Sequence, residues 1–349
     1  MFKNGIVIGK FAPLTRGHIN LINLAACQCE HLKVIISYDQ RWVDKQNNRD
    51  RKRLGLKNRK KWLMYTYNEI KHISVHVIDE TSIPEYPHGR QEFAELIRPF
   101  IDENCAIFSG EPEELDYIKQ YIPEITPVVV DSQRTRVPIS ANMVRKNIYK
   151  YWDYIPSIVR KDYTISVCLI GQESTGKSTM AMMLGKLFNT SWTEEYGRTY
   201  SERVLFGDES LYESYDYAKI AYRNKELEEE ALKHANKIVF IDTNAFITEY
   251  YHRLYEGYSN PIVSAIAHNE NYDYVIYLAP TVKWVDDGLR VNSDRSKTTP
   301  LFNALLAEYP NQLPEGRTLY IDAKSYLERF NQAAQFADKI LNTFNQGEY

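Results

Sequence analysis

One stretch of the sequence has the residue types and spacing of phosphate chemistry. It is segment 171–178, which reads G-x-x-x-x-G-K-S. In such a P-loop, backbone N–H groups surround the phosphates of a nucleotide, the lysine reaches the β- and γ-phosphates, and the hydroxyl ligates Mg²⁺. Lys177 is therefore a candidate catalytic residue and Ser178 a candidate metal ligand. We expect ATP to contact the loop and the start of the following helix: Gly171, Glu173, Ser174, Thr175, Gly176, Lys177, Ser178 and Thr179.

The residues on either side give this loop the context that a phosphate site needs. The apolar run 165–170 has the length and composition of a buried strand, and apolar residues recur every three or four positions from Met180 to Phe188, as in a helix. A helix N-terminus carries a partial positive charge that favours anions. Strand, loop and helix in this order favour a phosphate site over a chance glycine-rich turn.

Acidic residues farther along could supply the remaining groups of a phosphotransfer site. In W-T-E-E-Y-G-R, one of Glu194 and Glu195 could accept a hydroxyl proton, while Arg198 could bind substrate and neutralise phosphate charge. The alternative is an exposed polar loop, and the sequence does not decide which glutamate is catalytic. A later apolar strand ends in Asp242, a Walker B pattern in which the carboxylate acts in catalysis, holds Mg²⁺ and contacts substrate.

A loop in the last quarter of the chain has the composition of a lid. It contains Trp284, Asp287 and Arg290 within seven residues. We expect Trp284 and Asp287 to contact the substrate. Arg290 would reach the phosphates of ATP when the lid closes and excludes water.

The first half of the chain repeats the order of strand, loop and helix. The apolar run 5–9 precedes K-F-A-P-L-T-R-G-H, in which Thr15 and His18 stand three residues apart at a helix start. A histidine there could donate a hydrogen bond to a phosphate as charge builds in a transition state. Taken alone, His18 would be better explained as a capping or packing histidine.

Strands and helices alternate through both halves, which is typical of parallel sheets with helices on both faces. We therefore expect an α/β protein of two doubly wound parallel-sheet domains, a Rossmann-like domain over 1–160 and a P-loop kinase domain over 161–349. A long charged helix is expected over 215–234, with its acidic run Glu228 to Glu230 on a solvated face. The expected strands are 5–9, 32–37, 73–78, 105–108, 127–130, 165–170, 237–242, 272–278 and 318–321.

The composition excludes several classes of protein. The 349 residues carry a net charge of −3, which gives no overall attraction to nucleic acid or to an anionic membrane, and no apolar run is long enough to span one. Four cysteines without zinc-site spacing fit reduced thiols, so we expect a cytoplasmic protein. The basic segment 49–61 is best explained as a solvated helix and loop; contacts with a phosphate-bearing substrate or with nucleic acid are the alternatives. The composition does not decide whether the protein forms a homo-oligomer.

Two motifs in the first half resemble a known superfamily. G-K-F-A-P-L-T-R-G-H is similar to the G-x-F-x-P-x-[HT]-x-G-H signature of the adenylyl- and cytidylyltransferases, and I-S-A-N-M-V-R, residues 139–145, is similar to their second motif, I-S-x-T-x-x-R. Asn142 stands where the family has Thr. The resemblance implies that His18 and Arg145 are catalytic. It also implies that ATP contacts a set of residues from both motifs: Gly9, Lys10, Phe11, Thr15, His18, Ser140 and Arg145.

The order of the two halves resembles one family along essentially the whole chain, the bifunctional nicotinamide mononucleotide (NMN) adenylyltransferases/ribosylnicotinamide kinases of the NadR type. The resemblance implies phosphorylation of nicotinamide riboside to NMN with ATP, and adenylyl transfer from a second ATP to NMN, giving NAD and pyrophosphate. Mg²⁺ would be the cofactor. Tyr86, in Y-P-H-G-R, would contact substrate, although Arg90 stands where the family often has Trp. Because the first expected strand begins within the first residues, we expect no N-terminal helix-turn-helix domain.

Two other functions stay open at this level. One is a ribosylnicotinamide kinase whose first domain is weak or specific for another nucleotide. The other is a nucleotide-sensing regulator that uses the basic segment 49–61 on nucleic acid, although the near-neutral charge argues against it.

Overall fold

The computed structural model describes residues 1–285 and 294–347, so Asp287 and Arg290 lie outside the described residues. The chain forms two compact units. Unit 1 comprises Met1–Asp162 with Asn345–Gly347, and unit 2 comprises Tyr163–Phe344. Each unit has its own parallel sheet, which confirms the predicted α/β fold class.

The sheet of unit 1 has five parallel strands in the order β3-β2-β1-β4-β5. This order reverses direction beside β1, where doubly wound sheets open a crevice at the carboxyl ends of the strands. The register places Val7 of β1 opposite Val34 of β2 and Phe108 of β4, so the centre of the sheet is apolar. The strands are β1 (Phe2–Gly9), β2 (Cys29–Tyr38), β3 (Ile73–Asp79), β4 (Cys105–Ser109) and β5 (Thr126–Val129).

Helices cover this sheet and supply its core. Ala94 and Ile97 of α5, with Leu115 and Ile118 of α6, pack on Ile6 and its neighbours in the sheet. The helices are α1 (Arg16–Ala26), α2 (Gln40–Asp44), α3 (Asn48–Arg53), α4 (Leu56–Tyr67), α5 (Arg90–Ile97), α6 (Pro112–Tyr121), α7 (Ala141–Lys146) and α8 (Ser157–Tyr163), with short 3₁₀ turns η1 (Arg98–Phe100) and η2 (Trp152–Tyr154).

The sheet of unit 2 has four parallel strands in the order β7-β6-β8-β9. Leu169 of β6 pairs with Asp242 of β7, so the carboxyl end of β7 lies beside the strand that leads into the P-loop. The strands are β6 (Ile165–Ile170), β7 (Ile238–Asp242), β8 (Tyr274–Leu278) and β9 (Thr318–Ile321).

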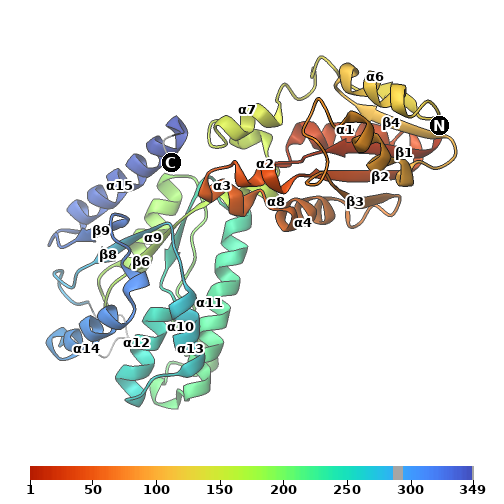
Figure 1. Ribbon diagram of the computed structural model, residues 1–349. Helices are drawn as coiled ribbons and strands as arrows, with labels where there is room; N and C mark the ends of the chain where they lie inside the picture. Colours follow the sequence, from red (N-terminus) through yellow and green to blue (C-terminus); the bar gives the residue numbers. More distant parts are fainter. Residues whose placement is uncertain (286–293, 348–349) are drawn as a thin grey trace. The chain divides into compact units, whose positions relative to one another are not determined.

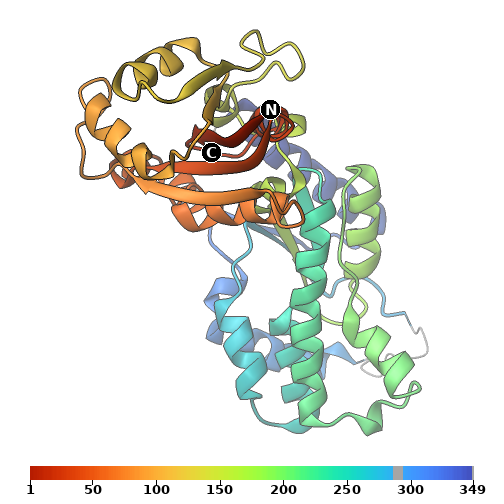
Figure 2. The same cartoon turned by 90° about the vertical axis from the view of Figure 1, so that its right-hand side faces the viewer.

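Two groups of helices flank this second sheet. Figure 1 shows α15 on one side and α11, α12 and α13 on the other. α11, a 21-residue helix that runs vertically in Figure 2, contacts α12 and α13, and these helices bury Tyr217, Ala221 and Phe246 against the sheet. The helices are α9 (Lys177–Leu187), α10 (Tyr196–Val204), α11 (Ser214–His234), α12 (Ala245–Glu256), α13 (Pro261–Asn269), α14 (Arg295–Glu308) and α15 (Tyr326–Gln346), with 3₁₀ turns η3 (Glu209–Leu211) and η4 (Pro310–Gln312).

Two expectations about charged residues need correction. Glu228 does not lie on a solvated face: it is buried, and it accepts hydrogen bonds from Lys225 and from the Tyr272 hydroxyl. Arg59, from the basic segment, is also fully buried. Within the described part of the chain, none of the helices combines the length and the apolar character needed to cross a bilayer.

Candidate active sites

The P-loop of unit 2 adopts a backbone that depends on its glycines. Gly176, the residue before α9, has φ +90°, in the left-handed region that glycine adopts without strain. Gly171 lies so close to β8 that a Cβ atom on it would stand 2.5 Å from the Leu278 carbonyl oxygen. Both glycines of the motif are therefore required by the geometry of the loop.

Two arginines from distant helices hold the carbonyl groups of this loop. Arg329 of α15 is fully buried and donates to the carbonyl oxygen of Thr175 at 3.0 Å. Arg295 of α14 donates to the carbonyl oxygen of Ser174 at 2.7 Å. These contacts fix the loop from the side of its carbonyl groups. Hydrogen bonds within the protein therefore hold the P-loop in this shape.

Asp242, at the end of β7, fits a role as a metal ligand. It is 2% exposed, and its Oδ2 atom has no hydrogen-bond partner among the described residues. Burial raises the pKa of its carboxyl group, the neighbouring charge of Glu195 raises it further, and Lys177 and the Ser178 hydroxyl oppose the change. A buried carboxylate with a vacant oxygen beside the P-loop hydroxyl is a donor set that suits Mg²⁺.

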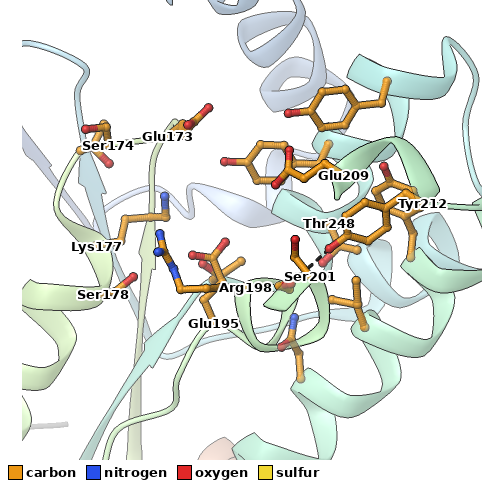
Figure 3. A pocket seen from close by; sticks show the side chains of 18 of the residues that line it. Glu173, Ser174, Lys177, Ser178, Glu195, Arg198, Ser201, Glu209, Tyr212 and Thr248 are labelled. Atoms are coloured by element: carbon orange, nitrogen blue, oxygen red, sulfur yellow. Dashed lines mark hydrogen bonds between the residues drawn. The ribbon is translucent and has the colours of Figure 1, made fainter. Parts of the chain in front are cut away.

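A cavity opens beside the P-loop. Its walls bring together Lys177, Ser178, Glu195 and Arg198, which Figure 3 shows on the same side of the cavity. The sequence-predicted residues that line it are Glu173, Ser174, Thr175, Gly176, Lys177, Ser178, Thr179, Glu195 and Arg198.

The structure separates the two adjacent glutamates. Glu195, the residue before α10, lines this cavity. Glu194 is exposed and lines a different depression, together with Trp192 and Arg223. Only Glu195 therefore stands where it can face a substrate bound next to the P-loop.

The other end of the cavity is formed by residues that the sequence motifs did not indicate. Glu209, Tyr212 and Thr248 lie opposite the P-loop side in Figure 3. Further tyrosines and an asparagine complete this wall, and the available signal was their helical spacing: positions 217, 220 and 224 of α11 recur at three- and four-residue intervals. The additional lining residues are Gly197, Ser201, Tyr217, Ile220, Asn224, Thr243, Tyr251 and Tyr255.

A second, more apolar hollow lies on the other side of the P-loop. Its lining includes Met180 and Met183 of α9, Tyr326 and Leu327 of α15, and Ser174. Trp284, predicted to contact substrate, lines neither this hollow nor the cavity beside Glu195 and Arg198.

In unit 1, Thr15 and His18 form a reciprocal cap at the start of α1. The Thr15 backbone N–H donates to Nδ1 of His18 at 3.1 Å, and the His18 backbone N–H donates to the Thr15 hydroxyl at 3.3 Å. The ring of Phe11 meets the imidazole edge-on, with centroids 5.1 Å apart. Burial, and then the positive charges of Arg145 and Arg134, lower the pKa of His18 to about 4. The imidazole is therefore neutral at pH 7.

The second transferase-like motif is joined to the first through Arg145 of α7. Arg145 donates to the Ala12 carbonyl oxygen at 2.7 Å and to Oδ1 of Asn142 at 3.0 Å. Asn142 therefore supports the arginine, although it replaces the family's threonine. Ser140 caps α7 by accepting from the Met143 backbone N–H at 3.2 Å.

Three cationic side chains lie over the ring of Trp42, near the first motif. Lys10, Arg59 and Arg145 lie over its ring at 5.2, 5.1 and 5.5 Å from the ring centroid. Arg59 also donates to the Lys10 carbonyl oxygen at 3.3 Å. One residue of the basic segment is thus placed beside the loop that contains Gly9 and Phe11.

Tyr86, predicted to contact substrate, is 71% exposed. Its hydroxyl accepts a hydrogen bond from Arg90 at 2.9 Å, and the Arg90 guanidinium lies over the rings of Tyr86 and Tyr117. The Arg90 side chain therefore stacks on aromatic rings, one of which, that of Tyr86, is exposed.

Comparison with known proteins adds an independent line of evidence. A family model described as an AAA domain matches residues 166–343. Two relatives, from Salmonella typhimurium (strain LT2) and Escherichia coli (strain K12), are both described as trifunctional NAD biosynthesis/regulator protein NadR. They are 33% and 35% identical to this chain, and the matches cover 97% of it and 83% of each relative.

Two solved NadR structures, one in complex with NR and one with NAD and AMP-PNP, share the fold. Each has a TM-score of 0.77 at 24% identity, covering 98% of this chain and 96% or 97% of theirs. The match extends over both sheets, and the sequence identity to the bacterial relatives extends equally far. The chain therefore belongs to the NadR family of NAD biosynthesis proteins.

Proposed function

We propose that this chain makes NAD in two linked steps, as a ribosylnicotinamide kinase and a nicotinamide-nucleotide adenylyltransferase. Unit 2 phosphorylates nicotinamide riboside with ATP, and unit 1 joins the resulting NMN to the adenylyl group of a second ATP. The observation that carries the proposal is the cavity of unit 2, where Glu195 and Arg198 stand beside the P-loop.

In the kinase step, the 5′-hydroxyl oxygen of the riboside attacks the γ-phosphorus of ATP. The new P–O bond forms as the bond to the bridging oxygen breaks, and ADP leaves. Glu195 accepts the hydroxyl proton, while Lys177 and Arg198 neutralise charge on the transferred phosphoryl group. The apolar hollow beside Met180 and Tyr326 offers a site for the adenine ring.

Mg²⁺ would be held by Asp242 and the Ser178 hydroxyl. When bound, it supplies charge neutralisation to the β- and γ-phosphates. The described residues contain no cluster of three or more His, Cys, Asp or Glu side chains that could hold a metal. This fits Mg²⁺, which commonly takes one or two protein ligands together with phosphate oxygens and water.

In the transferase step, a phosphate oxygen of NMN attacks the α-phosphorus of ATP, and pyrophosphate leaves. His18 donates from Nε2, because Nδ1 accepts the Thr15 N–H. Arg145, held by Asn142, would bind phosphate together with Lys10 and the backbone N–H groups at Ser140. Tyr86 would contact the nucleotide substrate.

Four free cysteines among the described residues fit a cytoplasmic location.

The test is a pair of assays on the purified full chain. One follows NMN formation from nicotinamide riboside and ATP, and the other follows NAD formation from NMN and ATP. Each product should require added Mg²⁺ and disappear with a chelator. Formation of NMN without NAD would indicate a kinase whose first unit has a different specificity. Absence of both products would overturn the proposal.

A further inference from the structure

The inference concerns Asn224, in the middle of α11. Its side chain is buried, at 4% exposure, and lines the cavity beside the P-loop. Neither its Oδ1 nor its Nδ2 has a hydrogen-bond partner among the residues that the structure describes. It is thus a complete amide group, one acceptor and one NH₂ donor, facing a ligand site.

Such a group is costly unless something binds to it. Buried polar side chains in native proteins are almost always hydrogen-bonded, and the exceptions are often functional. A second buried asparagine of unit 2 follows the rule. Asn244, also buried, donates from Nδ2 to Gln312 at 2.6 Å and accepts the Ile247 N–H at 3.2 Å. The free amide of Asn224 therefore points to a partner that comes with the substrate.

The surroundings of Asn224 indicate the chemistry of that partner. Tyr217 and Ile220 precede it on the same face of α11, seven and four residues earlier. Tyr251 and Tyr255 of α12 line the same cavity. Aromatic faces attract a flat, positively charged ring, and an apolar wall excludes water from a hydrogen bond at its edge.

We propose that Asn224 recognises the carboxamide of the nicotinamide ring and makes the kinase site specific for the amide over the corresponding carboxylic acid. The inference rests on the proposed kinase function. The substrate carboxamide presents one carbonyl oxygen and one NH₂ group, which match Nδ2 and Oδ1 of Asn224 in one planar pair. A carboxylate would place a negative oxygen against Oδ1 and leave that acceptor unpaired.

Ribose hydroxyl groups are the competing partner. They too can donate and accept, but the ribose 5′-hydroxyl must approach the transferred phosphoryl group beside the P-loop, where Glu195 and Arg198 lie. Asn224 shares its helix face with Tyr217 and Ile220, which suit the ring better than they suit the sugar. The two partners make different predictions for paired substrates.

The experiment measures steady-state kinase kinetics of the full chain with nicotinamide riboside and with nicotinic acid riboside. Wild type should prefer the amide. Asn224→Leu should raise KM for nicotinamide riboside about 10- to 100-fold and change KM for ATP by less than about two-fold. It should also bring the amide-to-acid ratio of kcat/KM close to one.

A second readout separates recognition from a structural role. Because the Asn224 amide has no partner in the described structure, Asn224→Leu should keep or raise the Tm of the ligand-free protein while weakening substrate binding. Asn224→Ala replaces it if the leucine variant does not fold. Tyr222→Leu, at a 59% exposed position on the same helix, is the matched control and should leave both substrates unaffected.

Each remaining outcome overturns something specific. Equal losses for the two substrates would assign Asn224 to the ribose, and unchanged kinetics would give it no role in recognition. Either result overturns the inference and leaves the kinase assignment intact. Wild-type protein that phosphorylates neither riboside would instead overturn the proposed function.

Discussion

Thr15 and His18 cap each other at the start of α1, with the Thr15 N–H on Nδ1 of the imidazole at 3.1 Å. This bond requires Nδ1 to be unprotonated, so the single hydrogen of the neutral ring is on Nε2. Burial and two nearby arginines reinforce the neutral form. The same contact that begins the helix therefore selects the tautomer that can donate to a phosphate.

The first prediction follows from the pKa of His18, which is lowered from its usual 6.5 to about 4. Between these values the unfolded chain binds a proton at this position and the folded chain does not, so His18 makes the protein less stable as pH falls from about 6.5 to about 4. His18→Asn removes this titration, and its Oδ1 can still accept the Thr15 N–H.

The measurement is the Tm of the ligand-free wild type and of His18→Asn, from pH 7.5 to pH 5. The difference, wild type minus variant, should fall as the pH is lowered. A constant difference over this range would show that His18 titrates alike in the folded and unfolded chains.

The second prediction assigns each chemical step to one unit. His18→Ala should lower NAD formation from NMN by about 10²- to 10³-fold, the usual effect of losing one donor to a developing charge, and should spare the kinase. Lys177→Ala should abolish NMN formation and spare adenylyl transfer. Separate assays with nicotinamide riboside and with NMN check both variants. A folded variant that loses both activities would contradict separate sites.

The third prediction distinguishes the two adjacent glutamates. Glu195→Gln should lower the kinase kcat by about 10²- to 10⁴-fold, because the amide cannot accept the hydroxyl proton. Glu194→Gln, at the exposed position outside the cavity, should change kcat by less than about two-fold. Single-turnover kinetics with nicotinamide riboside measure the chemical step directly, and the opposite ranking would move the base to Glu194.

The fourth prediction concerns stability and Arg329. This fully buried side chain donates to the carbonyl oxygens of Thr175, Ala279 and Ala323 and to the Thr281 hydroxyl. Arg329→Met leaves these acceptors without their donor and should lower the free energy of unfolding of unit 2 by about 3 kcal/mol or more.

Urea denaturation of the full chain, followed by probes in each unit, provides the measurement. The matched control is Arg223→Met, which removes an arginine paired with Glu226 and Glu230 at the surface of the same unit and should cost about 0–1 kcal/mol. Equal effects of the two substitutions would show that the buried contacts of Arg329 are not special.

The sequence predicted most strands well because most are apolar runs that end at, or are followed by, glycine or a polar residue. β6 was expected at 165–170 and is Ile165–Ile170, and the strand expected at 237–242 is Ile238–Asp242. The order of the strands in each sheet could not be predicted in the same way. The position of β6 between β7 and β8 depends on contacts distant in sequence, and no local pattern reports these.

Side chains outside motifs were the least predictable part of the sites. Asn224 stands in a run of charged residues that reads as an ordinary amphipathic helix, and Glu228 in the same helix was expected in solvent although Lys225 and Tyr272 bury it. Local sequence shows which face of a helix is polar. It does not show that another element will cover that face and pair with its charges.

The arginine contacts on the P-loop also have a consequence for the order of events during synthesis. The loop is translated about 150 residues before Arg329, which holds the Thr175 carbonyl group. On the ribosome, the first sheet can complete its core while the phosphate loop still lacks its final support. The kinase unit should therefore be the later of the two to acquire activity in a nascent chain, even though its nucleotide motif emerges well before the chain is finished.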